Sequence, residues 1–394
     1  DPVAKGTVAA KLSAVAASVP AMLKTLAVHG YRSLRDVVLP LGELTVVTGA
    51  NGVGKSNLYR ALALLGEAAS GRLIGALARA GGLASVLWAG PETISGAMKR
   101  GEVPVEGTAG RRRPVSLMLG FASEGFSYLI DVGLPPPSQS LFVHDAQIKR
   151  EAIWAGPVLR PAAVLASRVG AGLPGHLSLL AELADPRGNP EVSAVRREVM
   201  GWRLYDGFRT DAGAPARRPC PGTRTDALAA DGGDLAPAVQ TILESAWARP
   251  LADAVAAAFD GARLEVSESL GLFAVSLRQR GMLRPLEASE WSDGTLRFVC
   301  VATALLSPAP PPLLVLNEPE ASLHPSLLGP LAELVRQASG RGQVLVVTHH
   351  EGLAEALGGG GAVCHELVKP HGETEVAGQG LLTRPTWEWG SRRR

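Results

Sequence analysis

The 394-residue sequence has few cysteines and little excess charge, and each shortage excludes a class of protein. The three cysteines, Cys220, Cys300 and Cys364, are far apart and form no CxxC pair, so neither a disulfide framework nor a zinc site is expected. The cytoplasm, a reducing compartment, is therefore the expected location. The formal net charge is only +2, so any surface that binds nucleic acid must be local.

The sequence also lacks an uninterrupted hydrophobic run, so no membrane span is expected. Its longest apolar stretch, residues 298–316, is broken by Ser307 and four prolines, which predicts a helix, a loop and a strand. Residues 1–22 are Ala-rich, and we expect a leader that is flexible or added to the natural sequence. The composition is that of a globular protein, and the length allows two or three domains or one large core with an insertion.

The hydrophobic pattern predicts a protein of mixed α/β class. Two or three short strands are expected between residues 23 and 48, and a hairpin between 114 and 134. Near the end, helix and strand alternate: helix 293–306, strand 313–317, helix 326–338 and strand 343–348. Residues 141–225 are rich in Arg and Pro and predict no regular structure clearly.

A phosphate-binding motif follows the third of these strands. The run Gly49-Ala50-Asn51-Gly52-Val53-Gly54-Lys55-Ser56 fits the pattern GxxxxGK[ST], and a helical pattern begins at Asn57. Glycines let successive backbone N–H groups turn towards phosphates, and the N-terminus of a helix adds positive potential. The lysine would reach the β- and γ-phosphates, and the serine hydroxyl would bind Mg²⁺. The sequence therefore predicts a site for a nucleoside triphosphate such as ATP.

Four further features follow in a fixed order. In "SEWSDGTLRF", Ser292 can cap a helix and Gly294 lets that N-terminus approach a phosphate. The buried strand "LLVLNEPE" ends in Asn317 and Glu318, and "ASLHP" comes directly after it. The next strand, "VLVVTHH", ends in His349. Each feature alone has an ordinary structural explanation, but their order and spacing together predict one functional site.

With these motifs, the sequence resembles the RecF/SMC-like ABC-type ATPases, in particular compact members without a toprim domain or coiled-coil arm. The resemblance covers about residues 23–350 and implies an ATPase head with a mixed β-sheet core and an inserted α+β lid domain. It also implies a homodimer with two nucleotides at its interface. The motifs that carry it are "YRSLRD", "NGVGKSNL", "SVLWAG", "SDGTLR", "NEPEASLHP" and "THH".

The resemblance implies a role for each motif residue. Glu318 would activate the attacking water, and His349 would contact the γ-phosphate. Ser292 and Gly294 would act on the nucleotide of a second subunit. ATP would be bound by Gly49, Ala50, Asn51, Gly52, Val53, Gly54, Lys55, Ser56 and Asn57, and Mg²⁺ by Ser56 and Asn317.

The same resemblance predicts three parts after the leader. Residues 23–135 would form an N-terminal ATPase lobe, 136–260 an inserted helical, Arg-rich lid, and 261–394 a C-terminal ATPase lobe. The clusters Arg111–Arg113 and Arg217–Arg218 are either DNA-binding groups or part of a solvated surface of mixed charge. No aspartate follows Asp293, which excludes a toprim nuclease centre in the C-terminal part.

Asn317 leaves two functions open, because related enzymes have an aspartate at this position. An amide oxygen can accept a hydrogen bond from a magnesium-bound water, but it has no full charge, so we expect weaker divalent binding. If turnover were negligible, the protein would be a nucleotide-gated scaffold. Glu318 favours the other function, slow but real ATP hydrolysis, because a base is present where one is needed. A further alternative is that Asn317 only bonds neighbouring backbone at the strand end.

Overall fold

The computed structural model describes residues 22–104, 116–136, 138–169, 175–380 and 382–390. Residues 1–21, nearly all of the predicted leader, lie outside this range. The described chain divides into two compact units, and each is assembled from segments that are distant in the sequence. The first unit comprises the described residues of 1–42, 49–202 and 365–394, and the second comprises 43–48 and 203–364.

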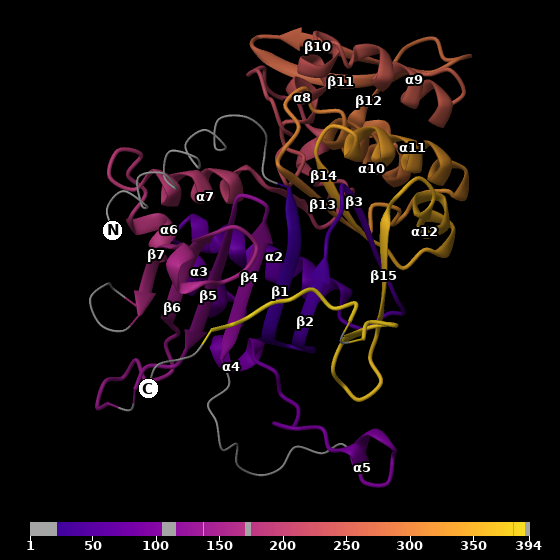
Figure 1. Ribbon diagram of the computed structural model, residues 1–394. Helices are drawn as coiled ribbons and strands as arrows, with labels where there is room; N and C mark the ends of the chain where they lie inside the picture. Colours follow the sequence, from indigo (N-terminus) through magenta and orange to yellow (C-terminus); the bar gives the residue numbers. More distant parts are fainter. Residues whose placement is uncertain (1–21, 105–115, 137, 170–174, 381, 391–394) are drawn as a thin grey trace. The chain divides into compact units, whose positions relative to one another are not determined.

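An antiparallel sheet forms the centre of the first unit, in the strand order β2-β1-β4-β5-β6-β7 (Figure 1). Nearly every residue of β5 is buried, which is unusual for an antiparallel strand and requires cover on both faces. Helix α2 contacts β1 and β4, and the Trp387 ring of the C-terminal segment lies 5.7 Å from that of Trp154 in β6. The strands are β1 Leu23–Tyr31, β2 Leu34–Pro40, β4 Leu117–Ser123, β5 Phe126–Gly133, β6 Gln147–Ala155 and β7 Val164–Val169.

The helices of the first unit include α2, which begins at Lys55 directly after the glycine-rich loop and packs against α6 and α7. A short hairpin of β15 and β16 completes the unit, with Leu367 paired to Val376. The bounds are α2 Lys55–Ala69, α3 Leu73–Arg79, α4 Leu83–Val86, α5 Gly96–Lys99, η1 Pro161–Ala163, α6 Leu179–Glu182, α7 Pro190–Gly201, β15 Val363–Val368 and β16 Glu375–Val376.

The segment 136–260, predicted as one lid, is divided between both units. Its first part supplies β6 and β7 to the sheet of the first unit, and its second part belongs to the second unit. Strand β6 was not predicted, because it contains Lys149-Arg150-Glu151 and charged residues are rare in a buried strand. Glu151 is fully buried there and accepts hydrogen bonds from the Tyr128 hydroxyl, the Ser178 hydroxyl and the Leu179 N–H, at 2.5 to 2.7 Å.

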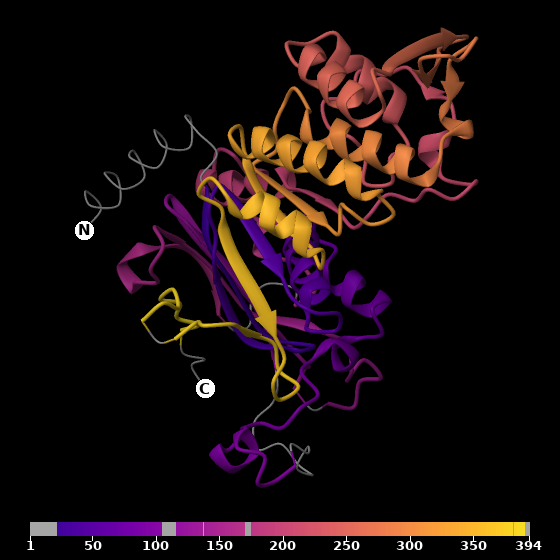
Figure 2. The same ribbon diagram turned by 90° about the vertical axis from the view of Figure 1, so that its right-hand side faces the viewer.

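Parallel strands form the main sheet of the second unit, in the order β3-β14-β13-β8. The predicted strand at 313–317 is confirmed, since β13 has those bounds and is buried throughout. Figures 1 and 2 show α10, α11 and α12 packed beside these strands, with α11 against β14 and α12 against β3. The bounds are β3 Leu44–Thr48, β8 Arg203–Tyr205, α10 Asp293–Leu305, β13 Leu313–Asn317, η4 Pro325–Leu327, α11 Leu328–Ser339, β14 Gln343–Val347 and α12 Glu351–Gly358.

A small antiparallel sheet and two further helices continue the core of the second unit. Helix α8 contacts β11, and α9 contacts β10, α10 and α11. Among the described residues, no helix combines the length and the apolar character needed to cross a bilayer. These elements are η2 Pro215–Arg217, β9 Cys220–Pro221, α8 Leu235–Leu243, α9 Ala248–Ala258, β10 Arg263–Ser269, β11 Leu272–Arg278, β12 Leu286–Glu287 and η3 Ala288–Glu290.

Candidate functional site

The loop that links β3 to α2 has the backbone of a phosphate-binding loop. Gly49, Gly52 and Gly54 have φ angles of 142°, 80° and 113°, in the region that favours glycine. The Lys55 side chain is buried, and its ammonium donates to the carbonyls of Gly49 at 2.6 Å and Ala50 at 3.0 Å. The ammonium is therefore held against the inner backbone of the loop.

A polar brace that the sequence motifs did not reveal supports this loop within the first unit. The Thr374 hydroxyl donates to the Val53 carbonyl at 2.6 Å and lies 2.8 Å from the Ser33 hydroxyl. Asn57, the first residue predicted after the motif, donates from its amide to the Ser33 hydroxyl at 2.9 Å. A β-carbon at Gly54 would lie 2.7 Å from that same hydroxyl and closer still to the Thr374 hydroxyl. Gly54 is therefore required for space as well as for conformation.

The second unit brings Glu318 and His349 together, because parallel strands β13 and β14 end at the same edge of the sheet. The Glu318 carboxylate lies 3.3 Å from His349 Nδ1, and the Glu320 carboxylate lies 3.7 Å from the same nitrogen. Glu318 has a φ of 49°, and its N–H donates to the Val347 carbonyl at 2.7 Å. A non-glycine residue in this conformation is strained, and such strain is concentrated at functional sites.

Glu320 is the buried member of this group. Its side chain is only 2% exposed, whereas those of Glu318 and His349 are 35% and 41% exposed. The Thr348 hydroxyl donates to it at 2.5 Å, and this hydroxyl in turn accepts from the His350 N–H at 3.0 Å. Glu320 therefore anchors the end of β14, and Glu318 and His349 remain accessible to a substrate.

Asn317, predicted as a magnesium ligand, forms its hydrogen bond with a side chain and not with neighbouring backbone. Its amide donates to the Asp206 carboxylate at 2.5 Å. Asp206 directly follows β8, which runs parallel to β13 with Tyr205 level with Leu316. The motifs gave no indication of Asp206, because it lies 111 residues from Asn317 and follows a strand of only three residues.

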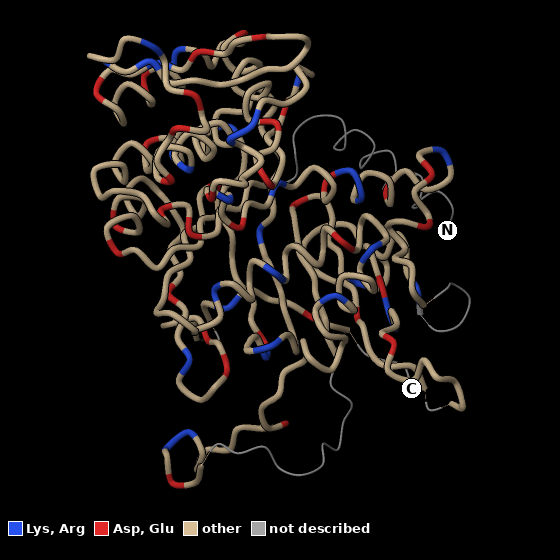
Figure 3. Tube along the Cα trace, turned by 180° about the vertical axis from the view of Figure 1, so that it is seen from behind, with Lys and Arg blue, Asp and Glu red and all other residues tan. Residues whose placement is uncertain are grey.

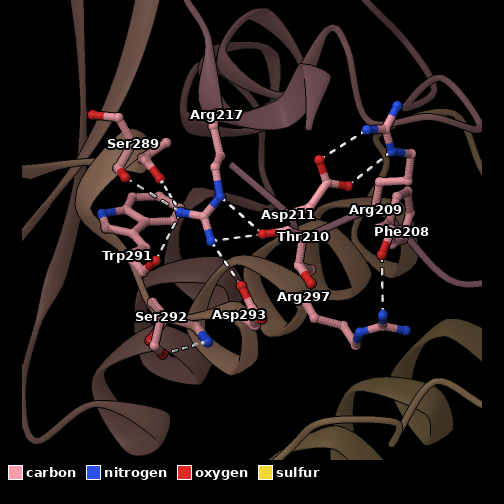
Figure 4. A network of polar contacts seen from close by, with 12 residues as sticks. Phe208, Arg209, Thr210, Asp211, Arg217, Ser289, Trp291, Ser292, Asp293 and Arg297 are labelled. Atoms are coloured by element: carbon pink, nitrogen blue, oxygen red, sulfur yellow. Dashed lines mark hydrogen bonds and ion pairs between the residues drawn. The ribbon is translucent and has the colours of Figure 1, made fainter. Parts of the chain in front are cut away.

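Ser292 caps α10 as predicted, since its hydroxyl accepts from the Thr295 N–H at 3.2 Å. Gly294 lies in the first turn, where a β-carbon would be 3.0 Å from the Ser322 carbonyl. Figure 4 shows how Arg217 holds the start of this helix: its guanidinium donates to the Trp291 carbonyl at 2.7 Å and to the Asp293 carboxylate at 2.9 Å. A buried arginine thus fixes the segment SEWSDGTLRF, residues 289–298, within the second unit, and this stretch is called the signature segment below.

These contacts bear on the Arg clusters, for which a DNA-binding role and a solvated surface of mixed charge were the two alternatives. Only 8% of the Arg217 side chain is exposed, and it also donates to the carbonyls of Thr210 and Ala288. Arg218 is exposed, whereas Arg111–Arg113 lie outside the described residues. Positions with basic and acidic side chains are interspersed along the described chain in Figure 3. Of the Arg217–Arg218 pair, Arg218 is therefore the residue available to a nucleic-acid backbone.

A family model matches residues 44–151 and 173–355, and the family is described as "AAA domain, putative AbiEii toxin, Type IV TA system". The match includes the phosphate loop, Ser292, Asn317, Glu318 and His349. An OLD nuclease of Thermus scotoductus is 50% identical over 44 residues, which span 11% of this chain and 8% of that protein.

The fold is similar to solved SMC head domains. An Smc head domain with an extended coiled coil, derived from Pyrococcus furiosus and bound to the C-terminal domain of ScpA, aligns with a TM-score of 0.51 and 14% identity. The alignment covers 90% of this chain and 96% of that one. The SMC head domain from Thermotoga maritima aligns with a TM-score of 0.47 and 15% identity, covering 91% and 100%. The predicted fold class is confirmed, and the chain belongs to the matched AAA-domain family and has the fold of a RecF/SMC-like, ABC-type ATPase head.

Proposed function

We propose that the chain binds ATP with Mg²⁺ and hydrolyses it slowly. The observation that carries this proposal is the pair of Glu318 and His349, 3.3 Å apart at the sheet edge where β13 and β14 end. Strand β3 ends at the same edge, and the phosphate loop begins at the next residue, Gly49. A base for water and a contact for the γ-phosphate are the two groups that hydrolysis needs near the loop.

Each motif residue has one task in this proposal. Backbone N–H groups of residues 49–56 bind the phosphates, with Asn57 supporting the loop, and Lys55 neutralises the β- and γ-phosphates. Glu318 accepts a proton from the attacking water, and His349 contacts the γ-phosphate. Ser56 supplies its hydroxyl to Mg²⁺, and Asn317 contributes its side chain from the end of β13. Oxygen groups of this kind suit Mg²⁺. The bound ion would offset the negative charge of the transferring phosphoryl group.

We further propose that two copies act together as a homodimer in the cytoplasm. Each chain carries one phosphate loop and one signature segment. Ser292 and Gly294 of one copy would contact the nucleotide held by the other. The Ser292 side chain is exposed, so its hydroxyl is accessible to such a partner.

A role in DNA maintenance or phage defence is proposed from the resemblance, and the 44-residue similarity to an OLD nuclease supports it. The Arg-rich segments would then contact nucleic-acid phosphates. The rival function is a nucleotide-gated scaffold or DNA-binding protein with negligible turnover, which Asn317 favours because it lacks the charge of an aspartate.

Phosphate release separates hydrolysis from the scaffold function. We would measure it for the wild type and for Lys55→Ala, each alone and with single-stranded DNA, double-stranded DNA or RNA. Slow release that Lys55→Ala abolishes is expected, and the polymer that stimulates the rate identifies the partner. Tight ATP binding with the same background release in both proteins would establish the scaffold function instead.

A further inference from the structure

We propose that Asp206, at the end of β8, supplies the metal-binding carboxylate that β13 lacks, with Asn317 as its positioning residue. The ligand is the divalent cation that accompanies the nucleotide, so this inference rests on the proposed function. The negative charge that related ATPases carry at the end of β13 would here be carried by the neighbouring strand.

The register of the two strands places these side chains together. Leu314, Val315 and Leu316 lie level with residues 203, 204 and 205 of β8, so the next residues, Asn317 and Asp206, are level at the same end of the sheet. The distance between the Asn317 amide nitrogen and the Asp206 carboxylate oxygen is 2.5 Å, which is short for a hydrogen bond to a charged acceptor. Asp206 is exposed, so its carboxylate is accessible to a hydrated cation.

The hydrogen bond also fixes which way the Asn317 amide points. Only its NH₂ group can face a carboxylate favourably, so its carbonyl oxygen must face away. That oxygen is buried and has no hydrogen-bond partner within the part of the chain that the structure describes, and Asn317 itself is only 9% exposed. A buried acceptor without a partner is unfavourable, because it has lost its hydrogen bonds to water. A cation, or a water bound to it, would remove that cost.

Asp206 and Asn317 fit the coordination of Mg²⁺ better than that of a metal whose ligands all come from the protein. Among the described residues, no group of three or more His, Cys, Asp and Glu side chains could hold a metal ion. Mg²⁺ with a nucleotide needs no such group, because it is bound by one or two carboxylates, by phosphate oxygens and by waters. The single exposed carboxylate of Asp206, held in place by the Asn317 amide, is therefore sufficient.

The same geometry explains why position 317 holds an amide. An aspartate there would place two carboxylates within hydrogen-bond distance of each other, and like charges so close are unfavourable unless a cation or a proton lies between them. An amide donates to Asp206 instead and holds it in place. One negative charge is therefore still present at this edge of the sheet, but it lies at the end of β8 and not at the end of β13.

Reciprocal substitution tests the proposal, with Mn²⁺ as a spectroscopic substitute for Mg²⁺. Electron paramagnetic resonance would measure Mn²⁺ affinity in the presence of a non-hydrolysable ATP analogue for the wild type, Asp206→Asn and the exchanged double variant Asp206→Asn/Asn317→Asp. Asp211→Asn is the matched control, because Asp211 is an exposed aspartate of the same segment that pairs with Arg209. We expect Asp206→Asn to weaken Mn²⁺ binding roughly 10- to 100-fold. The exchanged variant should recover most of this loss, and the control should bind as the wild type does.

Wild-type Mn²⁺ affinity in Asp206→Asn would overturn the proposal and leave Asp206 as a partner of the Asn317 amide alone. Failure of the exchanged variant to recover affinity would overturn the idea that the charge has moved between strands. Binding of a fluorescent ATP analogue in EDTA is measured in parallel. If the wild type bound no nucleotide in either assay, the proposed function itself would be contradicted, which is a result distinct from a loss confined to Mn²⁺.

Discussion

The carboxylate of Glu318 lies 3.3 Å from Nδ1 of His349, and the two residues follow adjacent parallel strands. Glu318 is held in a left-handed conformation, while its N–H donates to the Val347 carbonyl of β14. The backbone bond therefore ties the candidate base to the strand that carries the candidate γ-phosphate contact. A water that approaches the exposed side of Glu318 would meet a carboxylate whose position is set by the main chain.

This arrangement predicts different defects for Lys55→Ala and Glu318→Gln. Lys55→Ala should abolish ATP binding, because it removes the charge held against the loop. Glu318→Gln should keep ATP affinity and lower the hydrolysis rate by roughly 10²- to 10⁴-fold, because it removes only the base. Fluorescent-ATP titration and light scattering would measure affinity and mass, and Glu318→Gln should accumulate an ATP-bound dimer. Equal loss of affinity in both variants would contradict this division of roles.

The polar brace predicts that two glycines of one loop differ in their tolerance of alanine. Both Gly52 and Gly54 have a positive φ, so either substitution should cost about 1–2 kcal/mol of backbone strain. A β-carbon at Gly52 meets no atom within 4 Å, whereas at Gly54 it would collide with the Ser33 and Thr374 hydroxyls. Gly54→Ala should therefore lose both thermal stability and ATP affinity, and Gly52→Ala should lose clearly less of each. Indistinguishable unfolding curves would show that the brace can move aside.

Much of the sheet edge could be predicted from local sequence. Strand β13 has an apolar run of four residues between prolines and the polar Asn317, and β14 has a similar apolar run of four residues before the polar Thr348. Parallel strands flanked by helices are buried on both faces, so they need such continuous apolar sequence. The positions of Asn317, Glu318 and His349 at the strand ends follow from it directly.

The partners of these residues could not be predicted in the same way. Asp206 reaches Asn317 through the pairing of β8 with β13, which joins segments more than a hundred residues apart and leaves no local pattern. Thr374 reaches Ser33 over 341 positions and lies in a hairpin that no motif covers. Tertiary contacts of this kind depend on the register of distant strands and on the path of the chain end. A single sequence gives neither.

A composite dimer site predicts complementation between two inactive chains. Gly294→Asp should be inactive, since a side chain there lies 3.0 Å from the Ser322 carbonyl and adds a negative charge next to the partner's nucleotide. Mixing it with Lys55→Ala should restore one intact site per heterodimer and thus a substantial part of wild-type phosphate release. Gly294→Ala, without the charge, is the matched control for crowding. A mixture as inactive as either parent would indicate that each site is built within one chain.

Arg217 and Arg218 are adjacent, and their surroundings predict opposite phenotypes. Arg217→Ala should lower the free energy of unfolding by a few kcal/mol, because it leaves several carbonyls and the Asp293 carboxylate without their hydrogen-bond donor. Arg218→Ala should leave stability unchanged and, if DNA is bound by this segment, weaken that binding and reduce its salt dependence. Calorimetry and DNA titrations at several salt concentrations would measure both. DNA binding that is insensitive to salt, or absent, would count against a phosphate contact.

Glu198 in α7 predicts how the stability of the protein depends on pH. Burial raises the pKa of this carboxyl from its usual 4.5 to about 7. The folded chain therefore binds a proton between pH 4.5 and 7 that the unfolded chain releases, and stability must fall as the pH rises through this window. Glu198→Gln, which stays neutral, should unfold like the wild type near pH 4 and be more stable at pH 8. The gain should be roughly 1–2 kcal/mol once partial exposure is allowed for. Glu191→Gln, in the first turn of the same helix, is the matched control for replacing a glutamate of α7 by an amide. A Glu198→Gln curve parallel to the wild type across the whole range would mean that solvent reaches the carboxylate and keeps it charged.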